Sequence, residues 1–256
     1  ARGVPLPARH VVTALVLVPA VLLAACSGDG DGAGPAPDEV AGQAIDATVA
    51  AGTAHFASTL DSDSGPGVTL LLRFDGDVSF ATNAARYDVY NFQTSNPLHP
   101  TAFVQSVLTG GRAWQRAGAA DSPWEEVAVN FTAIAPWTNA TATTPAASLR
   151  DALLGRSFRT VGDDDIDGEP VSRYQSTAQR TIDLWTDRQG RIRLIRSDAP
   201  HPDATQAAAG QREQCVVELT EFGKDVEITP PAALASPEPA PQHRPVGLVV
   251  ALVLAP

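Results

Sequence analysis

The chain has 256 residues, of which 44% are hydrophobic and 18% are charged. This is enough for one domain of ordinary size or two small ones, and it is too apolar for a disordered chain. The formal net charge of -11 argues against nucleic acid as a partner, because an acidic surface repels the phosphate backbone. Two cysteines are too few for a disulfide scaffold.

The N-terminal residues 1–25 have the pattern of a secretory signal peptide. A short basic start precedes the apolar run Val11–Leu23, which is too short for a confident membrane span. Residues 23–26 read Leu-Ala-Ala-Cys, which resembles the lipobox of bacterial lipoproteins. That resemblance implies cleavage before Cys26 and a lipid anchor on its sulfur. The alternatives are an ordinary signal cut after Ala25 and a buried apolar segment.

Composition divides the rest of the chain into three parts. Residues 26–37 form a tether rich in Gly, Asp and Pro, residues 38–231 form the globular body, and residues 232–256 form a Pro-rich linker with a short apolar tail. The ten residues Val246–Ala255 are too few to span a bilayer. They could rest on the membrane, lie in a groove, or reflect a misread gene end.

Two helices are predicted in the body. Pro37, Asp38 and Glu39 begin the first, with both acids in its first turn and Gly52 at its end. The second has Thr144 as N-cap, Pro145 in the first turn and Gly155 as the terminal glycine. Its predicted buried face consists of Leu149, Leu153 and Leu154.

Most of the remaining body is predicted to form strands. Asp75-Gly76 is predicted as a bulge or tight turn between strands 68–74 and 78–81. Residues 103–109 fit a strand but also a helical face. The clearest hairpin alternates Ile182 and Leu184 with Asp183 before a turn at 187–190, and Ile192 and Leu194 with Arg191 and Arg193 after it. Further strands are expected at 56–60, 86–92, 112–116, 171–176, 215–222 and 226–228. Many strands with few helices predict an antiparallel α+β fold.

Several motifs in this order resemble the LppX/LprG lipoproteins, relatives of the LolA and LolB lipoprotein carriers. Besides the lipobox they are Ala54-His55-Phe56, Gly76-Asp77-Val78-Ser79-Phe80, Gly111-Arg112-Ala113-Trp114, Trp124-Glu125-Glu126-Val127, Asp167-Gly168-Glu169-Pro170-Val171 with Tyr174, Leu184-Trp185-Thr186-Asp187 with Gly190, and Phe222-Gly223-Lys224-Asp225-Val226. The resemblance implies a curved antiparallel β-sheet, a half-open barrel, with helices packed on its concave face. An Arg-rich, Lys-poor composition is typical of high-GC coding and indicates an actinobacterial source.

The same resemblance implies an apolar cavity between the sheet and the helices that holds acyl chains. Burial of each methylene contributes about 0.8 kcal/mol, so such a site needs no polar motif. Inward-facing positions expected to line it are Leu70, Leu72, Phe74, Phe80, Leu149, Leu153, Ile182 and Leu184. For each of them a filled core is the alternative. Residues 130–143 are either a mobile loop over the cavity mouth or only a loop.

The sequence predicts no catalytic residue, no metal site and no cofactor. In Gly162–Gly168 the spacing of Asp163, Asp165 and Asp167 matches a calcium loop, but the twelfth position is Tyr174 rather than Glu, which favours an acidic turn. The histidines have no metal-ligand spacing, and nucleophile and phosphate-binding motifs are missing. Cys215 is predicted to be a buried, unreactive thiol.

These observations favour a lipid carrier anchored at the extracytoplasmic face of the cell membrane. Its expected partners are an acyl lipid or lipoglycan, the membrane through the anchor on Cys26, and a membrane transporter or regulatory protein. The alternative is a sensor or protein-binding module of the RseB type without a lipid ligand.

Overall fold

A computed structural model describes residues 36–63, 69–93, 102–118, 121–138, 142–177, 180–200 and 212–231. All of them belong to one compact unit that begins at Pro35. The predicted signal peptide, the anchor at Cys26 and the apolar tail lie outside the described residues. Within these residues, no helix has the length and apolar character needed to cross a membrane.

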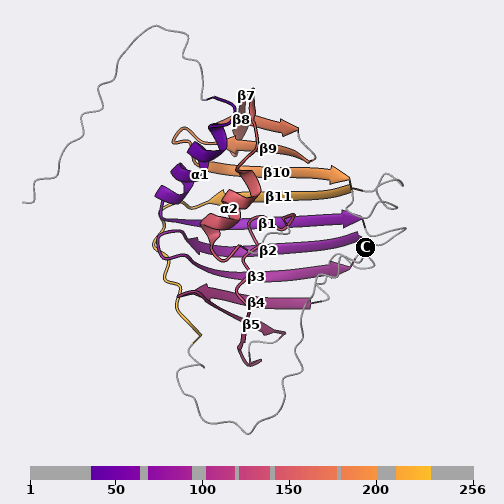
Figure 1. Cartoon of the computed structure of the whole chain (residues 1–256). Helices are drawn as coiled ribbons and strands as arrows, with labels where there is room; N and C mark the ends of the chain where they lie inside the picture. Colours follow the sequence, from indigo (N-terminus) through magenta and orange to yellow (C-terminus); the bar gives the residue numbers. More distant parts are fainter. Residues whose placement is uncertain are drawn as a thin grey trace, which may run out of the picture. The chain divides into compact units, whose positions relative to one another are not determined.

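The body is built on one sheet of 11 strands, ordered β6-β5-β4-β3-β2-β1-β11-β10-β9-β8-β7 (Figure 1). Every paired neighbour is antiparallel. The strands are β1 (Thr53–Asp63), β2 (Thr69–Ser79), β3 (Ala84–Gln93), β4 (Ala102–Thr109), β5 (Arg112–Ala117), β6 (Glu125–Val127), β7 (Arg159–Ile166), β8 (Glu169–Thr177), β9 (Thr181–Thr186), β10 (Ile192–Pro200) and β11 (Arg212–Thr220). β6 and β7 stand at opposite ends of this order, so the sheet is open.

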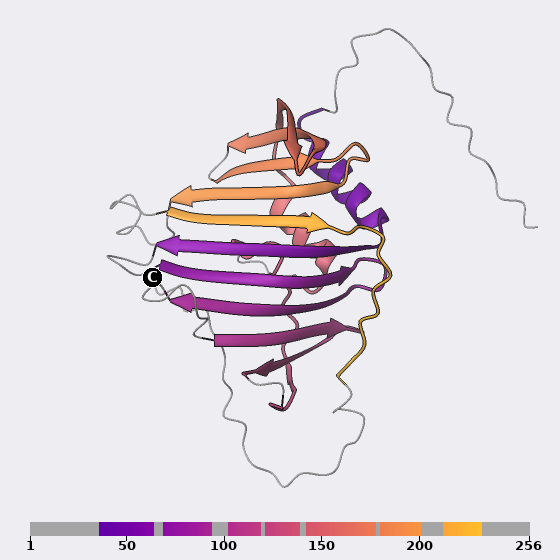
Figure 2. The same ribbon diagram turned by 180° about the vertical axis from the view of Figure 1, so that it is seen from behind.

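Two helices, α1 (Val40–Ala50) and α2 (Pro145–Leu153), lie against one face of the sheet, here called the helix face (Figure 1). Seen from behind, the strands lie in front of the helices (Figure 2). The predicted α+β fold, with an antiparallel sheet and helices on one face, is therefore confirmed. α2 joins two meanders, β1–β6 and β7–β11, which meet where β1 pairs with β11.

The helix ends follow local chemistry with two departures from prediction. Thr144 Oγ1 accepts a hydrogen bond from the backbone N–H of Ala147 at 3.1 Å, which confirms the predicted N-cap of α2. Leu154, however, is 50% exposed, because the helix ends at Leu153 and Leu154 takes an extended backbone conformation. In α1, the acids Asp38 and Glu39 lie in the turn before the helix instead of in its first turn.

The predicted break at Asp75-Gly76 is wrong, because β2 runs through both residues. Gly76 pairs with Phe56 of β1 on one side and Tyr87 of β3 on the other. A Cβ at Gly76 would lie 2.2 Å from the carbonyl oxygen of Arg86 and 2.5 Å from the Cα of Tyr87. The glycine thus permits close approach of β3 rather than a turn.

In three other segments the structure either departs from the sequence prediction or decides between two alternatives. Residues 103–109, ambiguous in sequence, form strand β4. Residues 226–228 are not a strand, because Glu221 and Gly223 take positive φ angles of 48° and 73° and turn the chain away after β11. In β10 a bulge between Ile192 and Leu194 places Leu194 opposite Trp185, away from the helix face, and Ile195 takes the predicted inward position.

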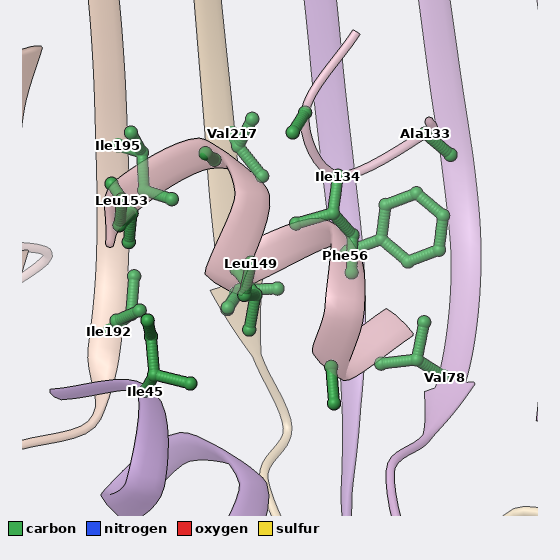
Figure 3. Close-up of a cluster of buried hydrophobic side chains, with 14 of the residues drawn as sticks. Ile45, Phe56, Val78, Ala133, Ile134, Leu149, Leu153, Ile192, Ile195 and Val217 are labelled. Atoms are coloured by element: carbon green, nitrogen blue, oxygen red, sulfur yellow. The ribbon is translucent and has the colours of Figure 1, made fainter. Parts of the chain in front are cut away.

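The core lies between the helix face and the two helices (Figure 3). Leu149 and Leu153 of α2 pack over Val217 and Ile195 of β11 and β10, and Ile45 of α1 lies near Ile192. The aromatic rings of Phe56, Tyr87 and Phe131 contact each other with centroids 5.6 to 6.2 Å apart.

Candidate functional site

The predicted lining residues whose side chains the structure describes belong to the helix face or to α2. Leu149, Leu153, Ile182 and Leu184 are fully buried, while Phe74 and Phe80 are 8% and 4% exposed. All six are in one continuous hydrophobic cluster, and Leu72 is half-buried against it. The backbone of Leu70 pairs in β2, but its side chain lies outside the described residues. The geometry brings the described positions together in one core.

The segment 130–143, considered in the sequence as a loop over a cavity mouth, contributes to the core instead. Phe131, Ala133, Ile134 and Ala135 are at most 1% exposed. Figure 3 places Ile134 and Ala133 beside Phe56 on the helix face. Their burial was not predicted, because a stretch rich in Ala, Thr and Asn has no period that distinguishes an inserted loop from a solvated one.

The helix face continues past the buried cluster as a row of half-buried apolar side chains, here called the apolar row: Leu72, Val89 and Val104. Val89 pairs with Phe74 of β2 and with Val104 of β4. Leu72 lies two residues before Phe74 in β2, so both side chains are on the same face. Leu72 and Val89 pack directly against the cluster. An apolar molecule laid along this row would therefore extend the existing core.

A group of polar side chains lies on the helix face near the C-terminal end of β10 and the N-terminal end of β11. Arg180, which precedes β9, donates through Nη1 to Ser197 Oγ at 2.9 Å and through Nη2 to Glu213 Oε1 at 2.5 Å. The Arg180 and Glu213 side chains are only 16% and 12% exposed. Ser197 pairs with Cys215, and both are fully buried. Burial, with the Glu213 charge second, raises the pKa of the Cys215 thiol well above its usual range.

The opposite face of the sheet carries ion pairs as well as the aromatic side chains of Tyr90, Phe92 and Phe103. Asp183 Oδ1 accepts hydrogen bonds from Arg173 Nη2 at 2.8 Å and from Gln175 Nε2 at 3.0 Å. The guanidinium groups of Arg112 and Arg173 lie 5.1 and 5.0 Å from the ring centroids of Trp114 and Trp185. Both tryptophans thus pack under arginine side chains on this face.

Most of the acidic segment Gly162–Gly168 belongs to strand β7 and not to the acidic turn that the sequence favours. Residues up to Ile166 belong to β7, and only Asp167 and Gly168, with φ angles of 53° and 82°, form the turn to β8. Asp164 Oδ2 accepts a hydrogen bond from Trp185 Nε1 at 3.0 Å. In the part of the chain that the structure describes, no three His, Cys, Asp or Glu side chains are grouped as a metal site.

Comparison of the fold with solved structures finds matches at low sequence identity, among them the following three. LprF from Mycobacterium bovis is 13% identical, with 77% of this chain and 99% of that chain covered and a TM-score of 0.49. A LolA superfamily protein from Nitrosomonas europaea is 9% identical, with coverage of 75% and 96% and a TM-score of 0.33. The Pseudomonas aeruginosa MucA/MucB complex is 14% identical, with coverage of 71% and 56% and a TM-score of 0.34. Neither protein-family comparison nor the curated proteins gave a match.

Sequence reasoning missed the polar group around Arg180. Arg180 and Glu213 are separated by more than thirty residues and lie in segments with no recognisable motif. Only the pairing of β10 with β11 brings Ser197 and Glu213 within reach of one arginine.

Proposed function

We propose that this protein is a carrier that binds the acyl part of a lipid against its helix face, along the apolar row. The observation that carries the proposal is the half-buried state of Leu72 and Val89, which pack against the buried cluster and continue it on the helix face. Apolar side chains that continue a core toward solvent offer a surface on which an apolar ligand can be buried.

The chemistry of the apolar row suits an alkyl chain. Each methylene moved from water onto an apolar surface contributes about 0.8 kcal/mol, so several methylenes give useful affinity without directed hydrogen bonds. Extended strands present side chains on one face at every second residue, and Phe74 and Leu72 of β2 follow this spacing. An extended alkyl chain can therefore contact several strands at once.

Transport across the envelope is the second part of the proposal. The Leu-Ala-Ala-Cys sequence at residues 23–26 supports a lipid anchor on Cys26. An anchor at the extracytoplasmic face of the cell membrane would keep the body near a source of lipid, and the tether 26–37 would let it reach a partner.

Native mass spectrometry tests the proposal. The full chain with Cys26→Ala, which cannot carry a covalent acyl group, is purified from lipid-rich bacterial cells. We expect a non-covalent added mass that extracts into organic solvent and fragments as an acyl lipid. Leu72→Trp fills the apolar row and should abolish this mass.

Leu71→Trp is the matched control, because Leu71 adjoins Leu72 in β2 but points to the opposite face, where it pairs with Phe92. It should keep the added mass. The proposal is wrong if both variants hold the lipid equally, or if the parent chain stays free of lipid after incubation with excess acyl lipid.

A further inference from the structure

Part of the apolar row belongs to a line of apolar side chains that crosses four strands of the helix face. Phe74 of β2 pairs with Val89 of β3. Val89 in turn pairs with Val104 of β4, which pairs with Ala117 of β5. Because paired residues of antiparallel neighbours direct their side chains to the same face, these four residues form one continuous line, here called the cross-strand line.

Exposure increases along the cross-strand line from β2 to β5. Phe74 is 8% exposed, Val89 and Val104 are half-buried, and Ala117 is exposed. The described pairing of β6 with β5 ends at Gln115, so Ala117 stands at an edge of the described sheet. The cross-strand line therefore opens to solvent at β5.

The β2 end of the line is closed. Phe74 pairs with Ser58 of β1, and Ser58 pairs with Val217 of β11. Ser58 is 1% exposed and Val217 is fully buried, with Leu149 of α2 packed over it (Figure 3). A molecule that lies on the line from β5 inward would therefore stop at Phe74.

One long side of the line is also bounded by protein. Tyr87 lies two residues before Val89 in β3, and Ser106 lies two residues after Val104 in β4; both are buried. The ring of Phe131 lies on Tyr87, with centroids 5.6 Å apart. The sheet and the segment that contains Phe131 thus form a step, along which a thin apolar molecule contacts protein on two sides.

The other long side of the line is less suited to a second apolar chain. There a parallel line of paired residues runs from Leu72 of β2 through Asn91 of β3 to Ala102 of β4. Leu72 flanks Phe74 at the closed end, but a second chain on this line would cover the amide of Asn91. Covering a polar group with an apolar one is unfavourable, so the arrangement favours one bound chain.

The length of the cross-strand line corresponds to an alkyl chain of defined size. Neighbouring strands lie about 4.8 Å apart, so the three spacings from β2 to β5 cover about 14 Å. With carbon–carbon bonds near 1.5 Å, an extended alkyl chain advances about 1.3 Å per methylene, and about 11 methylenes cover this distance.

We propose that the helix face holds a single alkyl chain of about 12 carbons, which lies across β2–β5 with its methyl end at Phe74 and its polar end at Ala117. This inference rests on the proposed carrier function and adds to it the number, direction and length of the bound chain. Longer chains bind with their remaining carbons in solvent beyond β5, and lipids with two chains use one of them.

Saturated fatty acids from octanoate to stearate test the length, because their headgroup is constant. Binding to the Cys26→Ala chain is measured by displacement of a fluorescent fatty acid ester, below the micellar concentration of each acid. We expect the affinity to rise by up to about fourfold per carbon, as burial of each methylene gives, and to level off near laurate. A rise that continues unchanged to stearate overturns the proposed length.

The number of bound chains is tested with decanoyl-lysophosphatidylcholine and didecanoylphosphatidylcholine, which have the same headgroup and one or two chains. We expect the two affinities to agree within about threefold, because the second chain stays outside the site. A gain of about a hundredfold or more for the two-chain lipid, as burial of several further methylenes would give, overturns the single-chain site.

Val89→Trp places an indole across the middle of the line and should move the plateau to acids shorter by at least about four carbons, since one strand spacing is lost. Tyr90→Trp is the matched control, because Tyr90 adjoins Val89 in β3 but points to the opposite face, where its ring lies 5.1 Å from that of Phe103. It should keep the plateau near laurate. If Val89→Trp does not fold, as judged by circular dichroism, the smaller change Val104→Phe replaces it and should also shorten the plateau.

The outcomes separate this inference from the carrier function. A plateau that neither Val89→Trp nor Val104→Phe moves in a folded protein overturns the cross-strand site, as does either contrary result above, and each leaves the carrier function standing. Absence of binding for every lipid overturns both.

Discussion

Thr48 of α1 and Ile192 of β10 are joined by a hydrogen bond that fastens the first helix to the sheet. The Thr48 hydroxyl donates to the carbonyl oxygen of Ala44 at 2.7 Å and accepts from the backbone N–H of Ile192 at 2.8 Å. Ile192 begins the bulge of β10, where the regular ladder is interrupted. A side chain thus replaces the strand partner that the bulge removes.

Thr48→Val should lower the free energy of unfolding by about 1–3 kcal/mol, because it keeps the side-chain shape and leaves a buried N–H without its acceptor. Urea unfolding at neutral pH measures the change. Thr160→Val, on exposed β7, should change stability by less than about 0.5 kcal/mol. Equal effects of the two substitutions would show that the bond to Ile192 contributes little.

Gly76→Ala should destabilise the protein by several kcal/mol, since its new Cβ meets the backbone of Arg86 and Tyr87 in a packed sheet. Gly42→Ala is the contrasting case. Gly42 lies in α1, and no atom lies within 4 Å of the place that its Cβ would take, so alanine should stabilise by about 0.5–1 kcal/mol. Thermal unfolding of both variants checks the opposite signs; a similar shift in the same direction contradicts the explanation given for β2.

Leu153 and Leu154 are neighbours in sequence with opposite environments. Leu153 is fully buried and Leu154 is 50% exposed. Leu153→Ala should therefore lower the free energy of unfolding by about 2–5 kcal/mol, and Leu154→Ala by less than about 0.5 kcal/mol. Denaturant unfolding with equal m-values would establish both numbers. A large loss for Leu154→Ala would place that residue in the core, as its sequence pattern suggests.

The contrast shows what local pattern can and cannot predict. The Thr144 cap, the alternation in β9 and the hairpin turn at residues 187–190 depend on near neighbours in sequence, and the sequence predicts them correctly. Gly76 is misassigned from sequence because an Asp-Gly pair is typical of a tight turn. Here the glycine instead lets the backbone of β3 approach β2 closely, which the sequence of β2 alone does not reveal. Alternation places Leu194 on the wrong face because one extra residue in the bulge inverts the pattern.

The residues of the candidate site likewise fall into those that the sequence predicts and those that it does not. Positions such as Ile182 and Leu184 follow from alternation, so their place on the helix face is predicted correctly. Arg180, Ser197 and Glu213 come from the residue before β9, from β10 and from β11. Their meeting depends on the order of β9, β10 and β11, which a single sequence does not specify.

Cys215 supplies a test of burial and of pH dependence together. It is fully buried, and burial raises the pKa of its thiol above the usual range near 9.0. In the Cys26→Ala chain it is the single thiol, so labelling by a thiol reagent at pH 8 should be at least about a hundredfold slower in the folded protein than in urea. Comparable labelling rates would mean that the thiol is accessible.

The same shift has a defined sign for stability. As pH rises past the ordinary thiol pKa, the unfolded chain loses the Cys215 proton while the folded chain keeps it, so the unfolded state gains stability. The free energy of unfolding should therefore fall between about pH 8 and pH 10, and Cys215→Ala should reduce the slope. Tyr87, whose pKa burial also raises, adds a similar slope only nearer its ordinary pKa of 10.0, so Tyr87→Phe distinguishes its contribution. An identical slope with and without Cys215 would contradict the buried, neutral thiol.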